Sequence, residues 1–130
     1  MKDVVAIGEL LIDFAPVSTD DAGYPTLKAQ PGGAPGNFLA ALQKYGCTTA
    51  LMGKVGEDAF GNLLVNTLDT LGISTKGIVK DPSVFTTLAF VTLDATGNRE
   101  FSFARKPGAD TRLRVEELDT ALLDSCKVLH

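Results

Sequence analysis

The stretch PGGAPGNFLAALQKYGCTTALM, residues 31–52, decides the fold class of this chain. After a loop of small residues, apolar residues recur at helical spacing and predict a helix that begins at Asn37. They are Phe38, Ala41, Leu42 and Tyr45. Gly46 suits the left-handed residue that follows a helix, and Thr48–Met52 then has the composition of a strand. A helix followed so closely by a strand is typical of an α/β chain.

The same alternation of strands and helices extends in both directions. Val4–Ile7 is rich in β-branched residues, as expected for a strand buried on both faces of a parallel sheet. Asp58 suits the N-cap of a second helix, whose apolar stripe reaches Leu71. We also expect a helix over Val115–Leu123 and the beginning of a strand at Val128–His130. The pattern predicts an α/β fold with a largely parallel sheet and helices on both of its faces.

Two stretches interrupt this alternation. Phe14–Gln30 has turn residues and no helical period, whereas Thr86–Leu93 and Arg99–Ala104 predict the two strands of a β-hairpin. Hairpin strands do not extend a parallel sheet easily, so we expect them to form a flap over one end of it. The segments 14–30 and 84–105 are therefore predicted to be a lid, and a lid suggests a bound ligand.

Composition excludes several classes of function. The chain has 130 residues, 45% hydrophobic and 22% charged, which suits one globular domain. Its formal charge of −4 leaves no basic patch for a nucleic acid, and no apolar run approaches the roughly 18 residues of a membrane span. We therefore expect a cytoplasmic protein that binds neither nucleic acid nor a membrane. Cys47 and Cys126 lack CxxC spacing and the only histidine is His130, so no metal site is predicted.

Asp13 is the first candidate for ligand binding. It follows the predicted strand Val4–Ile7, and open α/β sheets bind ligands just beyond the carboxyl ends of their strands. A carboxylate can accept hydrogen bonds from two neighbouring hydroxyl groups, which suits a polyol. An Asp at this place is also typical of a turn or a helix cap, and Asp13 taken alone favours that structural role.

The small-residue loop 31–37 is the second candidate. Glycines there let backbone N–H groups approach a ligand closely at the start of a helix. The spacing does not match a phosphate-binding loop, because Gly61 is followed by Asn62 rather than by Lys. The turn after the first strand also lacks the GxGxxG pattern of dinucleotide-binding proteins. Asn37 could be a helix cap or a ligand contact.

Taken together, these motifs resemble the N-terminal signature of the ribokinase/PfkB family of carbohydrate kinases, and most of all its fructokinases. The Gly-Gly pair, Asn37 and two later glycines have the spacing of that signature, and Gly8–Asp13 is similar to the family's opening strand. Residues 54–61 resemble its GxDxFG element. Phe101–Arg105, followed by Ala109-Asp110, resembles the end of the fructokinase flap. Leu39 departs from the pattern, which usually has a small residue there.

The resemblance implies a fold and a set of residue roles. The fold would be a ribokinase-like three-layer α/β/α sandwich with a small β lid, and residues 1–130 would be the N-terminal part of this single domain. The complete protein would be about twice as long or more. In the family, the side chains at Asp13 and Asn37 hold sugar hydroxyls, and aromatic residues on the flap line the pocket. The implied substrate-binding residues are Asp13, Gly32, Gly33, Asn37, Phe101, Phe103 and Arg105.

Two of these roles have structural alternatives. Phe101 and Phe103 share one face of a strand, and they could simply pack the flap on the body. Arg105 resembles an arginine near the sugar or the transferred phosphoryl group, and it could instead be a solvated residue at a strand end.

The implied reaction is transfer of the ATP γ-phosphoryl group to a primary hydroxyl of fructose. In the family, the catalytic Asp belongs to a C-terminal GAGD-type loop, which this chain lacks, and most contacts to ATP and Mg²⁺ lie in that absent part. Pairing of two subunits through the lid is a further implication. The alternatives are a kinase of another sugar, a nucleoside or a keto-deoxy sugar acid, and a non-catalytic sugar-binding module. A nicotinamide-dependent dehydrogenase is disfavoured by the missing fingerprint.

Overall fold

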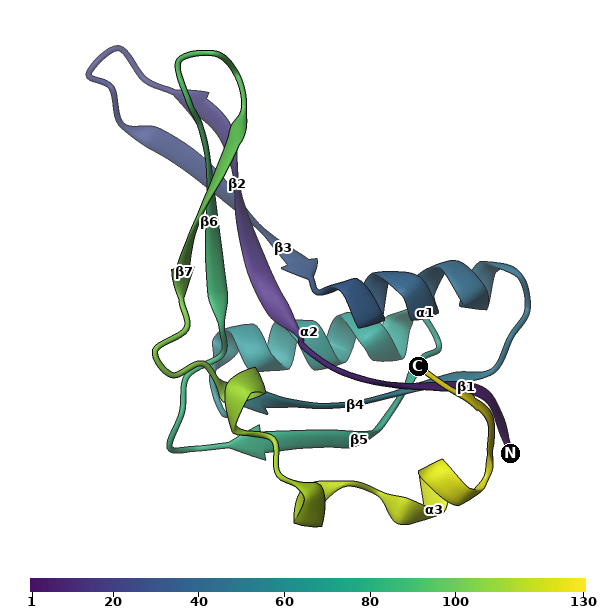
Figure 1. Ribbon diagram of the computed structural model, residues 1–130. Coiled ribbons are helices and arrows are strands. Elements are labelled where there is room, and N and C mark those ends of the chain that lie inside the picture. The colour runs from purple at the N-terminus through teal and green to yellow at the C-terminus, as the bar shows by residue number, and fades with distance from the viewer.

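The computed structural model describes residues 1–130 and contains two four-stranded sheets (Figure 1). The body sheet has the strand order β5-β4-β1-β8, and its neighbouring strands are all parallel. Its strands are β1 (Lys2–Ile7), β4 (Thr49–Gly56), β5 (Ser74–Asp81) and β8 (Cys126–Leu129). β4 is buried along its whole length, as the apolar composition of Thr48–Met52 predicts for a central parallel strand.

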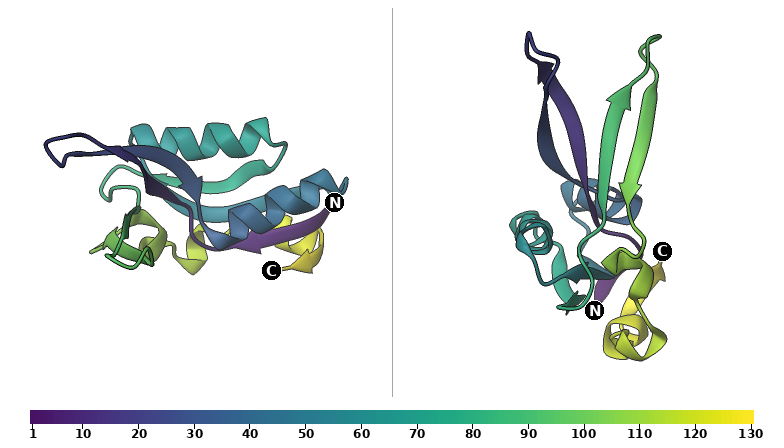
Figure 2. Two further views of the ribbon diagram at one scale, coloured as in Figure 1. Left: turned by 90° about the horizontal axis from the view of Figure 1, so that it is seen from above. Right: turned by 90° about the vertical axis from the view of Figure 1, so that its left-hand side faces the viewer.

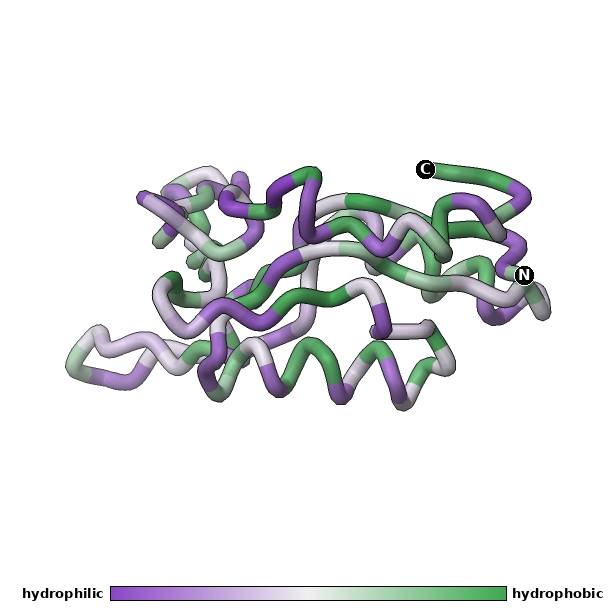
Figure 3. Tube along the Cα trace, turned by 90° about the horizontal axis from the view of Figure 1, so that it is seen from below, coloured by the Kyte–Doolittle hydropathy of each residue, from purple (hydrophilic) through white to green (hydrophobic).

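Helices cover both faces of the body sheet (Figure 2). One face packs on α1 (Ala34–Lys44) and α2 (Ala59–Thr70), where Leu39, Leu51 and Leu64 are at most 1% exposed. The other face is covered by the short helices η1, η2 and α3, and Leu122 of α3 and Leu118, the residue after η2, pack against the sheet. These helices are η1 (Ala109–Arg112), η2 (Val115–Glu117) and α3 (Thr120–Asp124). Hydrophobic and hydrophilic residues alternate along α2, as expected for a helix with one buried side (Figure 3).

The second sheet consists of two hairpins that stand away from the body (Figures 1 and 2). We call it the hairpin sheet; its strand order is β3-β2-β6-β7. Its strands are β2 (Leu11–Thr19), β3 (Pro25–Gly32), β6 (Leu88–Leu93) and β7 (Arg99–Ala104). Each hairpin is antiparallel, and parallel pairing of β2 with β6 joins the two. The predicted hairpin over 86–104 is confirmed, and residues 14–30 lie in a longer hairpin that reaches from Leu11 to Gly32.

Two predicted helices need correction. α1 begins at Ala34 instead of Asn37, because Pro35 suits the first turn of a helix and Gly33 supplies the N-cap with φ 112°. The helix expected over Val115–Leu123 is wrong, since extended backbone at Leu118 separates η2 from α3. β5 was not predicted from the sequence at all.

Asp13 is the third correction, because it does not lie in a loop after the first strand. The chain becomes extended again at Leu11, and Asp13 is the third residue of β2, where it pairs with Gln30 and with Ala89. Hydrogen bonding to strands on both sides outweighs the turn that an Asp in this place suggested. Asp13 is therefore held by the hairpin sheet.

The carboxylate of Asp58 connects the body to the second hairpin. It caps α2 as predicted, with Oδ1 accepting hydrogen bonds from the backbone N–H groups of Phe60 (3.0 Å) and Gly61 (2.8 Å). Its other oxygen accepts the backbone N–H of Thr86 at 2.8 Å, and the Thr86 hydroxyl donates to Oδ1 at 2.9 Å. That hydroxyl also accepts the N–H of Gly56, the last residue of β4, at 2.9 Å. One side chain therefore fixes both the start of α2 and the entry to β6.

We predict that Asp58→Ala lowers the free energy of unfolding by about 2–4 kcal/mol. Loss of the cap costs about 1 kcal/mol, and the polar groups of Thr86, which is 1% exposed, would lose buried partners at a further cost of about 1–3 kcal/mol. Urea unfolding measures the change. Asp119→Ala is the matched control, because Asp119 caps α3 and its carboxylate accepts only the N–H of Leu122. Equal losses for the two variants would contradict the second role of Asp58.

Candidate functional site

One face of the hairpin sheet gathers most of the predicted site residues. Asp13 and Ala89 are paired across β2 and β6, and Ala89 is paired with Phe103 across β6 and β7. Paired residues project from the same side of a sheet, so Asp13 and Phe103 share one face. The opposite face packs on the body, where the Phe14 ring lies 5.5 Å from that of Phe60. The face that carries Asp13 is therefore turned away from α2.

This face holds a groove with a volume of about 360 Å³. Its lining consists of Asp13, Ala15, Pro16, Gln30, Val91, Leu93, Arg99 and Phe101. Phe101 and Phe103 stack with ring centroids 6.2 Å apart, and each is 52% exposed. They are thus not buried against the body, which was the structural alternative for these two residues. The sequence prediction missed Gln30 and Arg99, whose places in the groove follow only from the strand register.

The carboxylate of Asp13 lies in this groove without a compensating partner. Burial raises the pKa of Asp13 above its usual range, and no hydrogen bond or nearby cation opposes the shift. Gly32 lies beside it, and a Cβ at this position would collide with Asp13 Oδ2. A glycine at position 32 therefore leaves the space that the carboxylate occupies. A partly buried acceptor with no partner in the chain is available to the hydroxyl groups of a ligand.

Glu9 is a second carboxylate that the sequence prediction did not single out. Its Oε1 accepts the backbone N–H of Ala34 at 3.1 Å, so it stabilises the first turn of α1 in place of a capping side chain. Gly33 is needed here, because its φ is +112° and a Cβ would lie 2.5 Å from the Glu9 carbonyl oxygen. The Glu9 carboxylate therefore occupies the start of α1, where a phosphate-binding loop would hold a phosphate group. This agrees with the absence of a phosphate-loop motif from the sequence.

Asn37 and Arg105 lie apart from the groove. Asn37 is exposed in the first turn of α1 and donates its backbone N–H to Gly33 O at 3.1 Å, so it is not the helix cap. It lines a small hollow to which Gly32 and residues of α2 also contribute. Arg105 is engaged in an ion pair with Asp110 at 2.6 Å. The structure thus brings together Asp13, Gly32 and the two phenylalanines, whereas Asn37 and Arg105 are not among the residues that line the groove.

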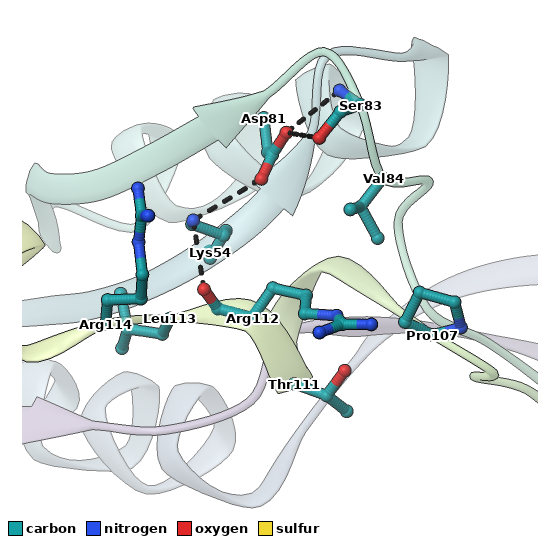
Figure 4. A pocket seen from close by; sticks show the side chains of 9 residues that line it. All are labelled: Lys54, Asp81, Ser83, Val84, Pro107, Thr111, Arg112, Leu113 and Arg114. Carbon is teal, nitrogen blue, oxygen red and sulfur yellow. Dashed lines mark hydrogen bonds and ion pairs between the residues drawn. The ribbon is translucent and has the colours of Figure 1, made fainter.

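A separate cleft of about 730 Å³ lies between the body sheet and η1 (Figure 4). Lys54, 3% exposed, donates to Asp81 at 3.4 Å, to Glu117 at 2.6 Å and to the carbonyl oxygen of Arg112 at 3.1 Å. The hydrogen bond from Lys54 is the main cause that lowers the pKa of Glu117. All three ammonium protons are used within the chain, so Lys54 joins β4, β5 and η1 and has no donor left for a ligand.

No group of three or more His, Cys, Asp or Glu side chains is arranged to hold a metal ion. None of the helices has the length and apolar character needed to cross a membrane.

Fold and site together define a ribokinase-like α/β protein, in which hairpins carry a carboxylate beside a Gly-Gly loop. The model of the pfkB family carbohydrate kinases matches residues 1–130, and the chain belongs to this family. It is 45% identical over 129 residues to a fructokinase of Solanum tuberosum, and 44% identical to the Arabidopsis thaliana protein named "Probable fructokinase-6, chloroplastic". These matches cover 98% of this chain, but only 40% and 34% of the respective relatives.

Solved structures give the same result. The crystal structure of a fructokinase from Xylella fastidiosa has a TM-score of 0.92 and 36% identity, covering 100% of this chain and 42% of that one. A structure of the Xylella fastidiosa fructokinase with bound ATP has a TM-score of 0.90 at 34% identity. The ribokinase-like fold predicted from the motifs is therefore confirmed, as is membership of the family.

We predict that Asp13→Asn raises the Tm near neutral pH. Because the folded chain holds the Asp13 pKa above its ordinary value of 3.8, the unfolded chain loses this proton more readily, and ionised Asp13 destabilises the fold as pH rises. The Tm difference between variant and parent should disappear at a pH well below 3.8, where the carboxyl is protonated in both the folded and the unfolded chain. Asp21→Asn, at the exposed turn of the same hairpin, is the control and should leave the Tm unchanged. A lower Tm for Asp13→Asn at neutral pH would contradict the assigned desolvation.

Proposed function

We propose that this chain is the N-terminal, sugar-binding part of an ATP-dependent kinase that phosphorylates a primary hydroxyl of fructose. The observation that carries the proposal is the Asp13 carboxylate, which lies in the groove without a partner in the chain. The missing side chain at Gly32 leaves the space that this carboxylate occupies. A sugar supplies the neighbouring hydroxyl donors that such a carboxylate needs. The fructokinase relatives and the ATP-bound Xylella fastidiosa structure support both the sugar and the nucleotide.

The proposed residues position the sugar and do not carry out the chemical step. Asp13 accepts sugar hydroxyls, while the backbone at Gly32 and Gly33 closes on the ring from the side. Phe101 and Phe103 offer apolar surface to the C–H groups of the sugar and exclude water as the hairpins close. Asn37 supplies a further amide contact. Arg105 is the exception, because it supplies a cation near the sugar or the transferred phosphoryl group. The catalytic base belongs to a GAGD-type loop, and most contacts to ATP and Mg²⁺ belong to the same C-terminal part, outside these 130 residues.

One observation favours a second substrate class. Arg99 lies in the same groove as Asp13, and a guanidinium is a suitable partner for a carboxylate. A keto-deoxy sugar acid has both the hydroxyls for Asp13 and the acid group for Arg99. A substrate panel that includes a sugar acid separates this alternative from fructose.

Two further expectations remain predictions. Pairing of two subunits through the hairpin sheet is supported by exposed apolar residues on the face that carries Asp13, namely Leu93, Phe101 and Phe103. A cytoplasmic location stays a prediction, since one relative at 44% identity is named as chloroplastic.

We predict that Asp13→Ala lowers kcat/KM for fructose by about 10- to 100-fold in the complete kinase, because a hydrogen bond to a charged group contributes about 1.5–3 kcal/mol. Sugar-dependent ADP release measures it, with Asp21→Ala as a control that keeps the parent rate. The 130-residue chain alone should release no ADP, since it lacks the base and the phosphate contacts. A kcat/KM that is unchanged in Asp13→Ala would remove Asp13 from the site, and a complete protein without sugar-dependent ADP release would contradict the proposed function.

A further inference from the structure

The guanidinium of Arg105 is fixed by a buried carboxylate. Its Nη2 donates to Asp110 Oδ2 at 2.6 Å, and its Nε donates to Oδ1 at 3.4 Å. The Asp110 side chain is 1% exposed, whereas that of Arg105 is 39% exposed. Asp110 therefore holds one edge of the planar guanidinium, and the remaining donors are left toward solvent.

Asp110 is itself held at the root of the hairpin sheet. The hydroxyl of Thr87, a residue with no exposed surface, makes a short hydrogen bond to Asp110 Oδ1. Gly108 makes this approach possible, because a Cβ there would collide with the Thr87 hydroxyl and lie 3.0 Å from Asp110 Oδ1. The carbonyl oxygen of Thr87 accepts the N–H of Ile12 at 3.1 Å. The strand that carries Asp13 and the carboxylate that holds Arg105 thus share one anchor.

The segment that carries Asp110 is attached to the body. Ala109 is fully buried and donates its N–H to Phe85 O at 2.9 Å. Two residues after Asp110, the carbonyl oxygen of Arg112 accepts a hydrogen bond from the buried Lys54 at 3.1 Å (Figure 4). Arg105 therefore lies at the fixed end of the second hairpin, although sequence position alone assigned it to a movable flap.

We propose that Asp110 is a positioning residue that orients Arg105, so that the open edge of the guanidinium faces an anionic oxygen of the reacting groups. This inference rests on the proposed kinase function. A cation that is already oriented stabilises developing charge without reorganising during the reaction, and a flexible arginine would first lose rotamer freedom. Asp110 lies behind the guanidinium and touches no substrate, so its effect passes entirely through Arg105.

A double-mutant cycle in the complete kinase tests this route. We expect Arg105→Gln to lower kcat by about 100-fold. Asp110→Asn should lower kcat by about 10-fold, because a misplaced group loses part of its effect. The KM for fructose should change less than about twofold in both variants, since the charge develops only in the transition state. The double variant should equal Arg105→Gln alone, as there is then no cation for Asp110 to orient.

Two further variants guard against an effect on folding. Thr87→Val removes only the hydroxyl that holds Asp110, and it should lower kcat in the same way without adding to Arg105→Gln. Asp119→Asn, a capping carboxylate on α3, should leave kcat unchanged. The inference would be overturned if the fold-decrease in kcat of a double variant equalled the product of those of its two single variants. A normal kcat for Asp110→Asn would overturn it as well.

Activity tests the proposed kinase function, and coupling between Asp110 and Arg105 tests the positioning role of Asp110. A complete protein that phosphorylates no sugar contradicts the proposed function, and the same cycle is then measured by thermal unfolding. A destabilisation by Asp110→Asn that shrinks in the Arg105→Gln background supports the coupling of the two residues. An equal destabilisation in both backgrounds overturns it.

Discussion

The fold depends on the hydrogen bonds of one carboxylate, that of Asp58. Its oxygens accept the first free N–H groups of α2 and also the backbone of Thr86, whose hydroxyl in turn holds the end of β4 at Gly56. A helix start, the carboxyl end of a central strand and the entry to the second hairpin therefore meet at a single residue. Pairing of β6 with β2 depends on that entry point, and the groove forms only where these strands pair.

The groove contains a carboxylate, that of Asp13, which lowers the stability of the fold when it is ionised. Asp13 keeps a carboxylate in a partly buried place where burial alone shifts its pKa, and nothing in the chain compensates for the lost hydration. Asp110, by contrast, is more deeply buried and is fully satisfied by Arg105 and Thr87. This contrast is the pattern expected where one carboxylate is available to a ligand and the other holds a neighbouring side chain in place.

The sequence predicted elements wherever local signals decide them. The apolar periods of α1 and α2, the Asp58 cap of α2 and the hairpin over 86–104 depend on neighbouring residues, and these predictions hold to within a few positions. Long-range pairing decided the rest. Asp13 lies on β2 because of partners at Gln30 and Ala89, and the predicted C-terminal helix is interrupted where Glu117 turns to pair with Lys54. No local pattern reveals Asp110 as the partner of Arg105.

The central claim is that the face of the hairpin sheet that carries Asp13 binds the sugar, and hydrogen exchange tests it most directly. Strands β6 and β7 have few contacts with the body, so their amide groups should exchange quickly in the free protein. In the complete kinase, saturating fructose should slow exchange over residues 86–104, and it should do so much less in Asp13→Ala. Exchange that stays the same under saturating fructose would contradict the claim and would leave Phe101 and Phe103 without a role in binding.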